Sequence, residues 1–85
     1  LENTMTLPPS LSRLLDSILC CECDFDRTKI DRLSVGEQRE AVEESAHHVG
    51  FEGGELHPLF PQLAAAFDIT DWQNTFEQGR IDAGL

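Results

Sequence analysis

The stretch that decides the fold is LSRLLDSIL, residues 11–19. Its leucines and its isoleucine recur at positions i, i+3, i+4, i+7 and i+8, which places them on one continuous stripe of an α-helix. Ser10 is expected to cap this helix, although a start at Thr6 is also compatible with the sequence because Pro8 and Pro9 are tolerated in a first turn. The stretch therefore predicts a helix with one buried face.

Helical spacing continues toward the middle of the chain. A short helix is expected over about 26–33, and its inward-facing positions are Phe25, Ile30 and Leu33. Ser34 and Glu37 have the S-x-x-E spacing of a capping box, which predicts a third helix over about 34–48. Its predicted buried line is Val35, Val42, Ala46 and Val49. Gly50 is expected to end this helix with a left-handed backbone, with Phe51 packing back against it.

Two further helices are predicted in the last third of the chain. The apolar residues of the fourth repeat at i, i+3, i+4 and i+7, and they are Phe60, Leu63, Ala64 and Phe67. Pro61 suits its first turn. A T-x-x-Q box from Thr70 to Gln73 is expected to open the last helix, which Gly79 would end. The apolar positions of that helix are Ile69, Trp72 and Phe76.

These patterns predict an all-α fold, a compact bundle of four to five short helices in a single domain. The domain is expected to span residues 6–81. Residues 1–5, which end at Met5, are interpreted as a cloning remnant or a disordered start, and residues 82–85 as a tail that either docks through Ile81 or frays.

The chain is strongly acidic, with sixteen Asp and Glu against six Lys and Arg and a net charge of −10. A field of this sign disfavours direct binding to nucleic acid or to an anionic membrane surface, and it attracts basic surfaces. The charge is also uneven, because residues 40–79 contain eight acidic residues and no Lys or Arg. This half of the chain is expected either to form a continuous negative surface or to meet a positive one. Solubility alone is the alternative explanation.

Three cysteines, Cys20, Cys21 and Cys23, lie within four positions. An odd and crowded set does not fit the disulfide framework of a small secreted protein, which favours a reducing, cytoplasmic setting. The longest apolar run, 63–67, is too short to cross a membrane. Cys20 and Cys23, with His47 and His48, are a candidate zinc site, but the cysteines continue an apolar stripe, and burial as small hydrophobic residues is the favoured interpretation.

No motif in the sequence predicts catalysis, and the chain is not expected to be an enzyme or to need a cofactor. Glu22, Asp24 and Asp26 surround the cysteines and would blunt a Cys–His nucleophile. Asp24, Asp26 and Thr28 have the spacing of the first three ligands of an EF-hand calcium loop, but Lys29 and Val35 stand where that loop needs Gly and Glu. The sequence therefore offers carboxylates in number but no catalytic arrangement.

The function favoured by these patterns is protein binding, as an inhibitor that blocks a basic, nucleic-acid-binding surface of a partner such as a nuclease. Immunity proteins, antitoxins and phage anti-defence proteins are analogous in class. The predicted binding residues are Glu37, Glu40, Glu43, Glu44, Glu52, Glu55, Asp68 and Asp71, with Trp72 or Phe51 as an apolar anchor. The alternatives are the zinc module and an adaptor domain that binds through an apolar groove. If the chain forms a homodimer, the contact is expected around Phe51, Phe60 and Trp72.

Overall fold

The computed structural model describes residues 7–23 and 26–85, and this part of the chain contains five helices and no strand. The helices are α1 (Pro9–Glu22), α2 (Arg27–Arg32), α3 (Val35–Phe51), α4 (Phe60–Ala66) and α5 (Trp72–Asp82). The predicted all-α bundle is confirmed. The interpretation of residues 1–5, the alternative start at Thr6 and the inward position of Phe25 lie outside the described residues. No helix in the described part combines the length and the apolar character that a membrane span requires.

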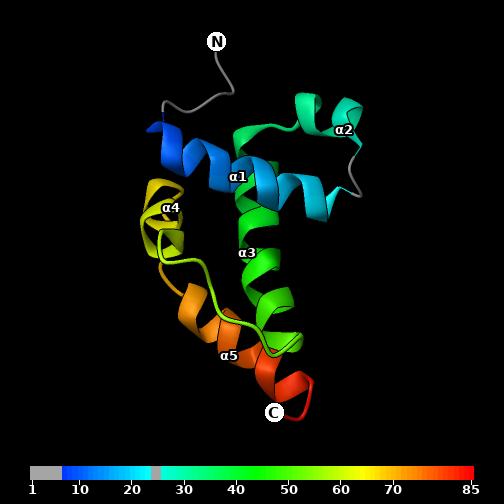
Figure 1. Cartoon of the computed structure of the whole chain (residues 1–85), viewed down its shortest axis with the longest axis vertical. Coiled ribbons are helices and arrows are strands. Elements are labelled where there is room, and N and C mark those ends of the chain that lie inside the picture. Colours follow the sequence, from blue (N-terminus) through cyan, green and yellow to red (C-terminus); the bar gives the residue numbers. More distant parts are fainter. Residues whose placement is uncertain (1–6, 24–25) are drawn as a thin grey trace.

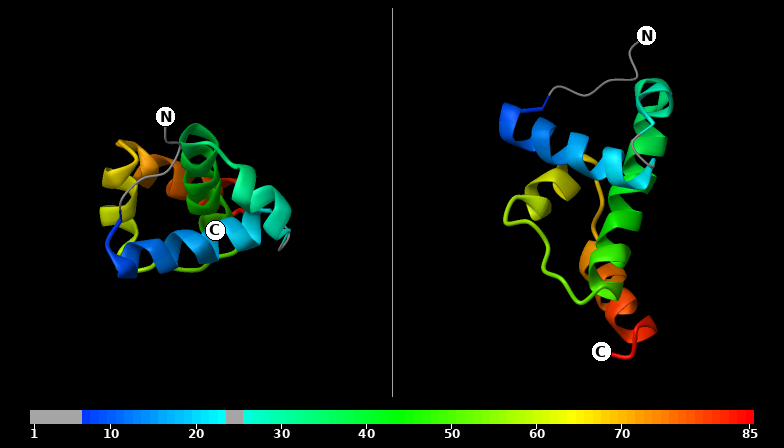
Figure 2. Two further views of the ribbon diagram at one scale, coloured as in Figure 1. Left: turned by 90° about the horizontal axis from the view of Figure 1, so that it is seen from above. Right: turned by 45° about the vertical axis from the view of Figure 1, so that its right-hand side comes forward.

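The long helix α3 is the axis of the molecule (Figure 1). Its most extensive packing partner is α5, while α1 crosses it and also contacts α2 and α4. The two turned views show the same arrangement, with α4 beside α1 and α5 alongside the C-terminal part of α3 (Figure 2). The molecule measures 42 × 24 × 20 Å. It is elongated because α5 extends along α3 beyond the region where α1 and α4 pack.

The core lies where α1, α3 and α4 meet. The stripe of 11–19 is confirmed: Leu14 is half-buried, and the other four apolar residues of the stripe are at most 9% exposed. All four apolar positions predicted for α4 are buried as well. The complete set of buried apolar residues is Leu11, Leu15, Ile18, Leu19, Ile30, Val42, Ala46, Phe60, Leu63, Ala64, Phe67 and Ile69. Burial of these side chains is the main stabilising term of so small a domain.

Side chains cap the two helices in the middle of the chain, α2 and α3. Ser34 Oγ accepts the Glu37 backbone N–H (3.2 Å), and Glu37 Oε1 accepts the Ser34 backbone N–H (2.9 Å), which confirms the capping box of α3. Asp26 caps α2 by accepting backbone N–H groups of Thr28 and Lys29. Both caps satisfy donors that a helix start would otherwise leave free.

The predicted caps of the first and last helices are wrong. Helix α1 begins at Pro9, with Pro8 in the cap position and Ser10 already helical. A proline fits there because the first turn has no intrahelical partner for its missing N–H. Helix α5 begins at Trp72, and no side chain caps it. Asp71, the residue before it, has φ −112° and ψ 29° instead of the extended conformation from which a side chain caps.

The predicted end of α3 at Gly50 is also wrong, because the helix continues to Phe51. Gly50 is buried where α3 crosses α5, and a Cβ there would collide with the Phe76 carbonyl oxygen. Gly79 of α5 faces it, and a Cβ at Gly79 would collide with the His47 carbonyl oxygen. The left-handed position belongs instead to Gly53 (φ 76°), whose N–H donates to the Gly50 carbonyl.

The last helix likewise passes through its predicted stop. Gly79 lies within α5, which ends at Asp82, and Gly84 takes the left-handed conformation (φ 80°). The Leu85 N–H donates to the Arg80 carbonyl and closes a Schellman motif. Residues 82–85 therefore fold back as the end of the helix. Ile81 does not dock, because 65% of its surface is exposed.

Candidate protein-binding surface

The solvent-facing side of α3 carries a row of acidic side chains that ends in an aromatic ring. Glu37, Glu40 and Glu44 are spaced i, i+3 and i+7, so they lie on one face of the helix, and all three are exposed. Phe51, seven residues beyond Glu44, continues this face and is 49% exposed. We call these four residues the α3 stripe. The opposite side of α3 packs against α1 and α5, which hold the α3 stripe in position.

Two open hollows extend the α3 stripe to the neighbouring helices. The first, about 500 Å³, lies between α3 and α5 and is lined by Glu40, Glu43, Glu44, His47 and Thr75. The second, about 320 Å³, reaches the end of α1 and is lined by Glu22, Glu44, His47, His48 and Phe51. The two hollows share Glu44 and His47. The carboxylates of α3 and Glu22 of α1 therefore lie around two adjoining hollows, to which α5 contributes the neutral Thr75.

One arginine approaches this surface. Arg39 Nη1 lies 4.0 Å from Glu43 Oε1, one helical turn away. The same guanidinium donates to two backbone carbonyls at the end of α4, those of Phe67 (2.9 Å) and Asp68 (3.3 Å). Since exposed ion pairs of this length contribute little, Arg39 joins α3 to α4 more than it neutralises Glu43.

Two histidines of the surface lie within hydrogen-bonding or ion-pairing distance of carboxylates. His47 Nε2 lies 2.8 Å from Asp82 Oδ2, which links α3 to the end of α5. The hydrogen bond with His47, and one donated by Gln78 (2.8 Å), hold the pKa of Asp82 below its usual value. His48 lies between Glu22 of α1 (3.5 Å) and Glu52 (3.2 Å). The predicted residue Glu52 therefore sits at the edge of the surface with a histidine partner.

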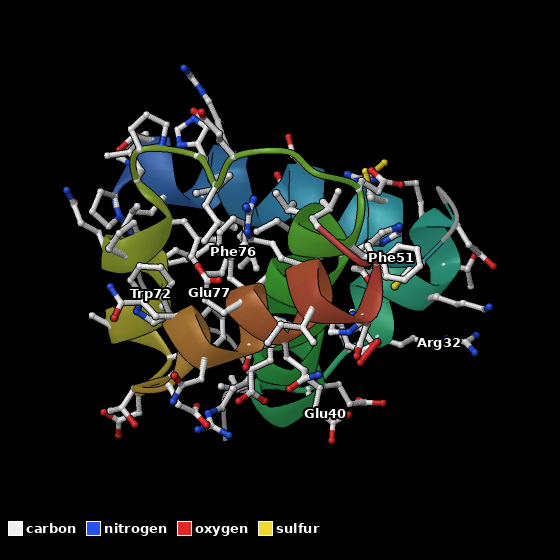
Figure 3. All side chains as sticks on the ribbon, turned by 90° about the horizontal axis from the view of Figure 1, so that it is seen from below. Arg32, Glu40, Phe51, Trp72, Phe76 and Glu77 are labelled. Atoms are coloured by element: carbon white, nitrogen blue, oxygen red, sulfur yellow. The ribbon has the colours of Figure 1, made fainter. Side chains whose placement is uncertain are left out.

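Glu37 adds negative charge to the surface, but its carboxylate is already engaged in a hydrogen bond within the helix cap. Its carboxylate accepts the Ser34 backbone N–H, and the Ser34 backbone and hydroxyl groups together lower the pKa of Glu37. Glu40 and Glu44, by contrast, project from the surface; Figure 3 shows Glu40 pointing away from the body of the molecule. Glu40 and Glu44 are therefore the carboxylates of the α3 stripe best placed to meet a partner.

The remaining predicted binding residues lie elsewhere. Trp72 is half-buried and packs edge-on against the buried Phe60, with ring centroids 5.6 Å apart. Glu55 and Trp72 line a separate hollow beside α5. Asp68 follows the end of α4 and Asp71 precedes α5, and both are exposed. The structure thus gathers the predicted residues of α3 on one face and places Glu55, Asp68, Asp71 and Trp72 away from it.

Some residues of the surface were not predicted as binding residues. Glu22, His47, His48 and Thr75 line the hollows with the α3 carboxylates. Spacing along α3 places His47 and His48 near Glu44, and that signal was available in the sequence. Glu22 and Thr75 come from other helices, so their place depends on how α1 and α5 pack on α3.

The candidate zinc ligands are not assembled into a metal site. Cys20 and Cys23 are half-buried and pack against the hydrophobic core, while His47 and His48 face carboxylates. Within residues 7–23 and 26–85, no group of three or more His, Cys, Asp or Glu side chains is arranged to hold a metal ion. The environment of the two cysteines agrees with the small-hydrophobe interpretation.

A mainly apolar hollow lies between α1 and α3 and adjoins the acidic surface, since Glu22 and His48 line both. It measures about 320 Å³, and Ile18, Cys21 and Val49 are among its lining residues.

Comparison of the chain with protein-family models, with curated proteins and with solved structures finds no match.

Proposed function

We propose that this protein is a protein-binding module, and specifically an inhibitor that covers a basic, nucleic-acid-binding surface of a partner protein with its own acidic one. The observation that supports the proposal is the grouping of Glu40, Glu43 and Glu44 of α3 with Glu22 of α1 around two adjoining hollows. The net charge of −10 gives this surface a long-range field that speeds encounter with a cationic partner.

The α3 stripe combines the two features that a charged interface needs. Glu40 and Glu44 lie one turn apart on the same helix, about 6 Å along its axis, so the helix sets their spacing before binding. Phe51 at the end of the stripe adds exposed apolar area, and aromatic residues are enriched among the residues that dominate binding energy. The carboxylates would select and orient the partner, and Phe51 would anchor it.

Inhibition follows from occupation of the site. A basic groove that binds phosphates would lose access to nucleic acid when a rigid row of carboxylates fills it, and no chemistry by this chain is required. Immunity proteins, antitoxins and phage anti-defence proteins act in this general manner, and the proposal places this chain in that functional class by analogy.

The test is capture of the partner from the native host with three versions of the protein: wild type, Glu40→Lys/Glu44→Lys and Asp16→Lys/Asp31→Lys. The two variants change the net charge equally, but Asp16 and Asp31 lie on α1 and α2, outside the acidic surface. We expect a basic protein that wild type and the Asp16/Asp31 variant retain and the Glu40/Glu44 variant loses. Far-ultraviolet circular dichroism establishes that all three versions are folded.

A second function, docking of an adaptor partner through an apolar groove, is favoured by the hollow of Ile18, Cys21 and Val49. In that case the Glu40→Lys/Glu44→Lys variant would retain the partner, and Val49→Asp would release it. The same capture experiment therefore separates the two functions.

A further inference from the structure

The separate hollow beside α5, which Glu55 and Trp72 line, lies on the other side of α5 from the α3 stripe. It measures about 560 Å³ and lies between α5 and the connection that follows α3. Its lining residues are Glu55, Leu56, Trp72, Gln73, Asn74, Phe76 and Glu77. In Figure 3, Trp72, Phe76 and Glu77 lie to one side of α5, whereas Glu40 projects beyond the other. The hollow is therefore separate from the surface to which the proposed inhibition is assigned.

The aromatic part of this hollow is held in place by the core. Trp72 contacts the buried Phe60 edge-on, with an interplanar angle of 65°, and Phe76 also packs against the hydrophobic core. Both rings are nevertheless only half-buried. A fixed aromatic ring with an open surface binds planar or cationic groups without first having to be ordered.

The charged part of the hollow is acidic. Glu55 on the connection and Glu77 on α5 are both exposed and line the same space as the two rings. Arg80 Nε lies 3.8 Å from Glu77 Oε1, a long ion pair between side chains that are 40% and 64% exposed. A pair with this length and exposure is weak, so an incoming cation could displace it.

We propose that this hollow binds the guanidinium group of an arginine side chain on a partner polypeptide. A guanidinium is planar and cationic, so it can lie against the Trp72 or Phe76 ring while donating hydrogen bonds to the Glu55 or Glu77 carboxylate. An ammonium group gains less from the same surroundings, because it is more strongly hydrated and lacks a flat face. The site takes one arginine and does not require the α3 stripe.

The probe is an N-acetylated, C-amidated Gly-Arg-Gly peptide, titrated into the full chain. Trp72 is the sole tryptophan, so its fluorescence and its indole N–H signal in NMR report directly on the hollow. We expect saturable shifts at Trp72 with a millimolar dissociation constant. The lysine peptide should bind more weakly, and the neutral citrulline peptide should leave Trp72 unchanged.

Matched variants locate the site. Glu55→Gln/Glu77→Gln should weaken binding of the arginine peptide about fivefold or more, and Glu40→Gln/Glu44→Gln, which removes the same charge elsewhere, should change it by less than about twofold. Arg80→Gln should strengthen binding, because it frees Glu77. Equal responses to the arginine and citrulline peptides, or equal effects of the two double variants, would overturn the proposal. Because the probe is a peptide and not the captured partner, this result is independent of the capture experiment.

Discussion

Asp68 ends α4 with a left-handed backbone at a position where glycine is the usual residue. Its φ is 61°, the only positive value at a non-glycine residue in the described part of the chain. Its N–H donates to the Ala65 carbonyl and the Ile69 N–H to the Ala64 carbonyl, which is the pattern of a Schellman motif. The side chain of Ile69 is buried, so this tight turn delivers an apolar residue to the core immediately after the helix.

Asp68→Gly is expected to raise the free energy of unfolding by about 0.5–1 kcal/mol, because glycine adopts this conformation without steric cost. Asp68→Ala should instead lower it by a similar amount, since alanine has the Cβ and lacks the local hydrogen bonding of aspartate. Urea denaturation of the two variants measures both values. Equal stability of the glycine and alanine variants would show that the left-handed backbone carries no strain.

Asp82 provides a test of electrostatics at the residue scale. Its pKa is lowered from 3.8 by hydrogen bonds from His47 and Gln78, so the folded state favours the charged carboxylate. A lowered folded-state pKa stabilises the protein above the unfolded-state value, and that stabilisation is lost as the pH falls through the folded-state value. We therefore expect Asp82→Asn to lower the melting temperature at pH 6 and to match wild type well below pH 3.8.

At the scale of elements, sequence patterns predicted the local features of the helices and missed the features that depend on packing. The stripe of α1 and the capping box of Ser34 and Glu37 need only spacing along one helix, and both are confirmed. The sequence predicted that Gly50 and Gly79 end helices, but both lie within helices, at the point where α3 and α5 cross. The sequence alone does not distinguish a glycine that ends a helix from one that allows a second helix to pack closely, because the difference depends on where the helices cross.

The crossing makes a sharp prediction about these glycines. Gly50→Ala places a methyl group 3.1–3.2 Å from backbone atoms of Phe76 and Arg80 and in collision with the Phe76 carbonyl oxygen, so α3 and α5 must move apart. We expect a loss of about 2–3 kcal/mol in the free energy of unfolding.

Gly36→Ala is the matched control, because it lies in the first turn of the same helix, where a Cβ would have only Ser34 Oγ near it, at 3.9 Å. There the better helix propensity of alanine should stabilise the protein by about 0.5–1 kcal/mol. If both substitutions stabilised the protein, that result would contradict the close packing of α3 against α5 at Gly50.

At the scale of the whole molecule, the charge imbalance was predictable from composition, whereas its arrangement was not. The helical spacing of Glu37, Glu40 and Glu44 already placed them on one face of α3. Which carboxylates of other segments join that face depends on packing: Glu22 of α1 does, and Glu55 does not. The basic side chains of α2, among them Lys29 and Arg32, are exposed on another helix. Exposed carboxylates also lie outside the candidate binding surface, at Glu55, Asp68, Asp71 and Glu77, so the surface is distinguished by the grouping of its carboxylates and not by charge alone.

The most direct measurement of the proposed function is the association rate constant with the captured partner as a function of salt concentration. For wild type and Asp16→Lys/Asp31→Lys, we expect the rate to fall about tenfold between ~50 and ~300 mM salt, since screening weakens attraction between complementary charged surfaces. For Glu40→Lys/Glu44→Lys, the rate should be low and nearly independent of salt. An association rate that is indifferent to salt in wild type, or equal in the two variants, would contradict binding through the acidic surface of α3.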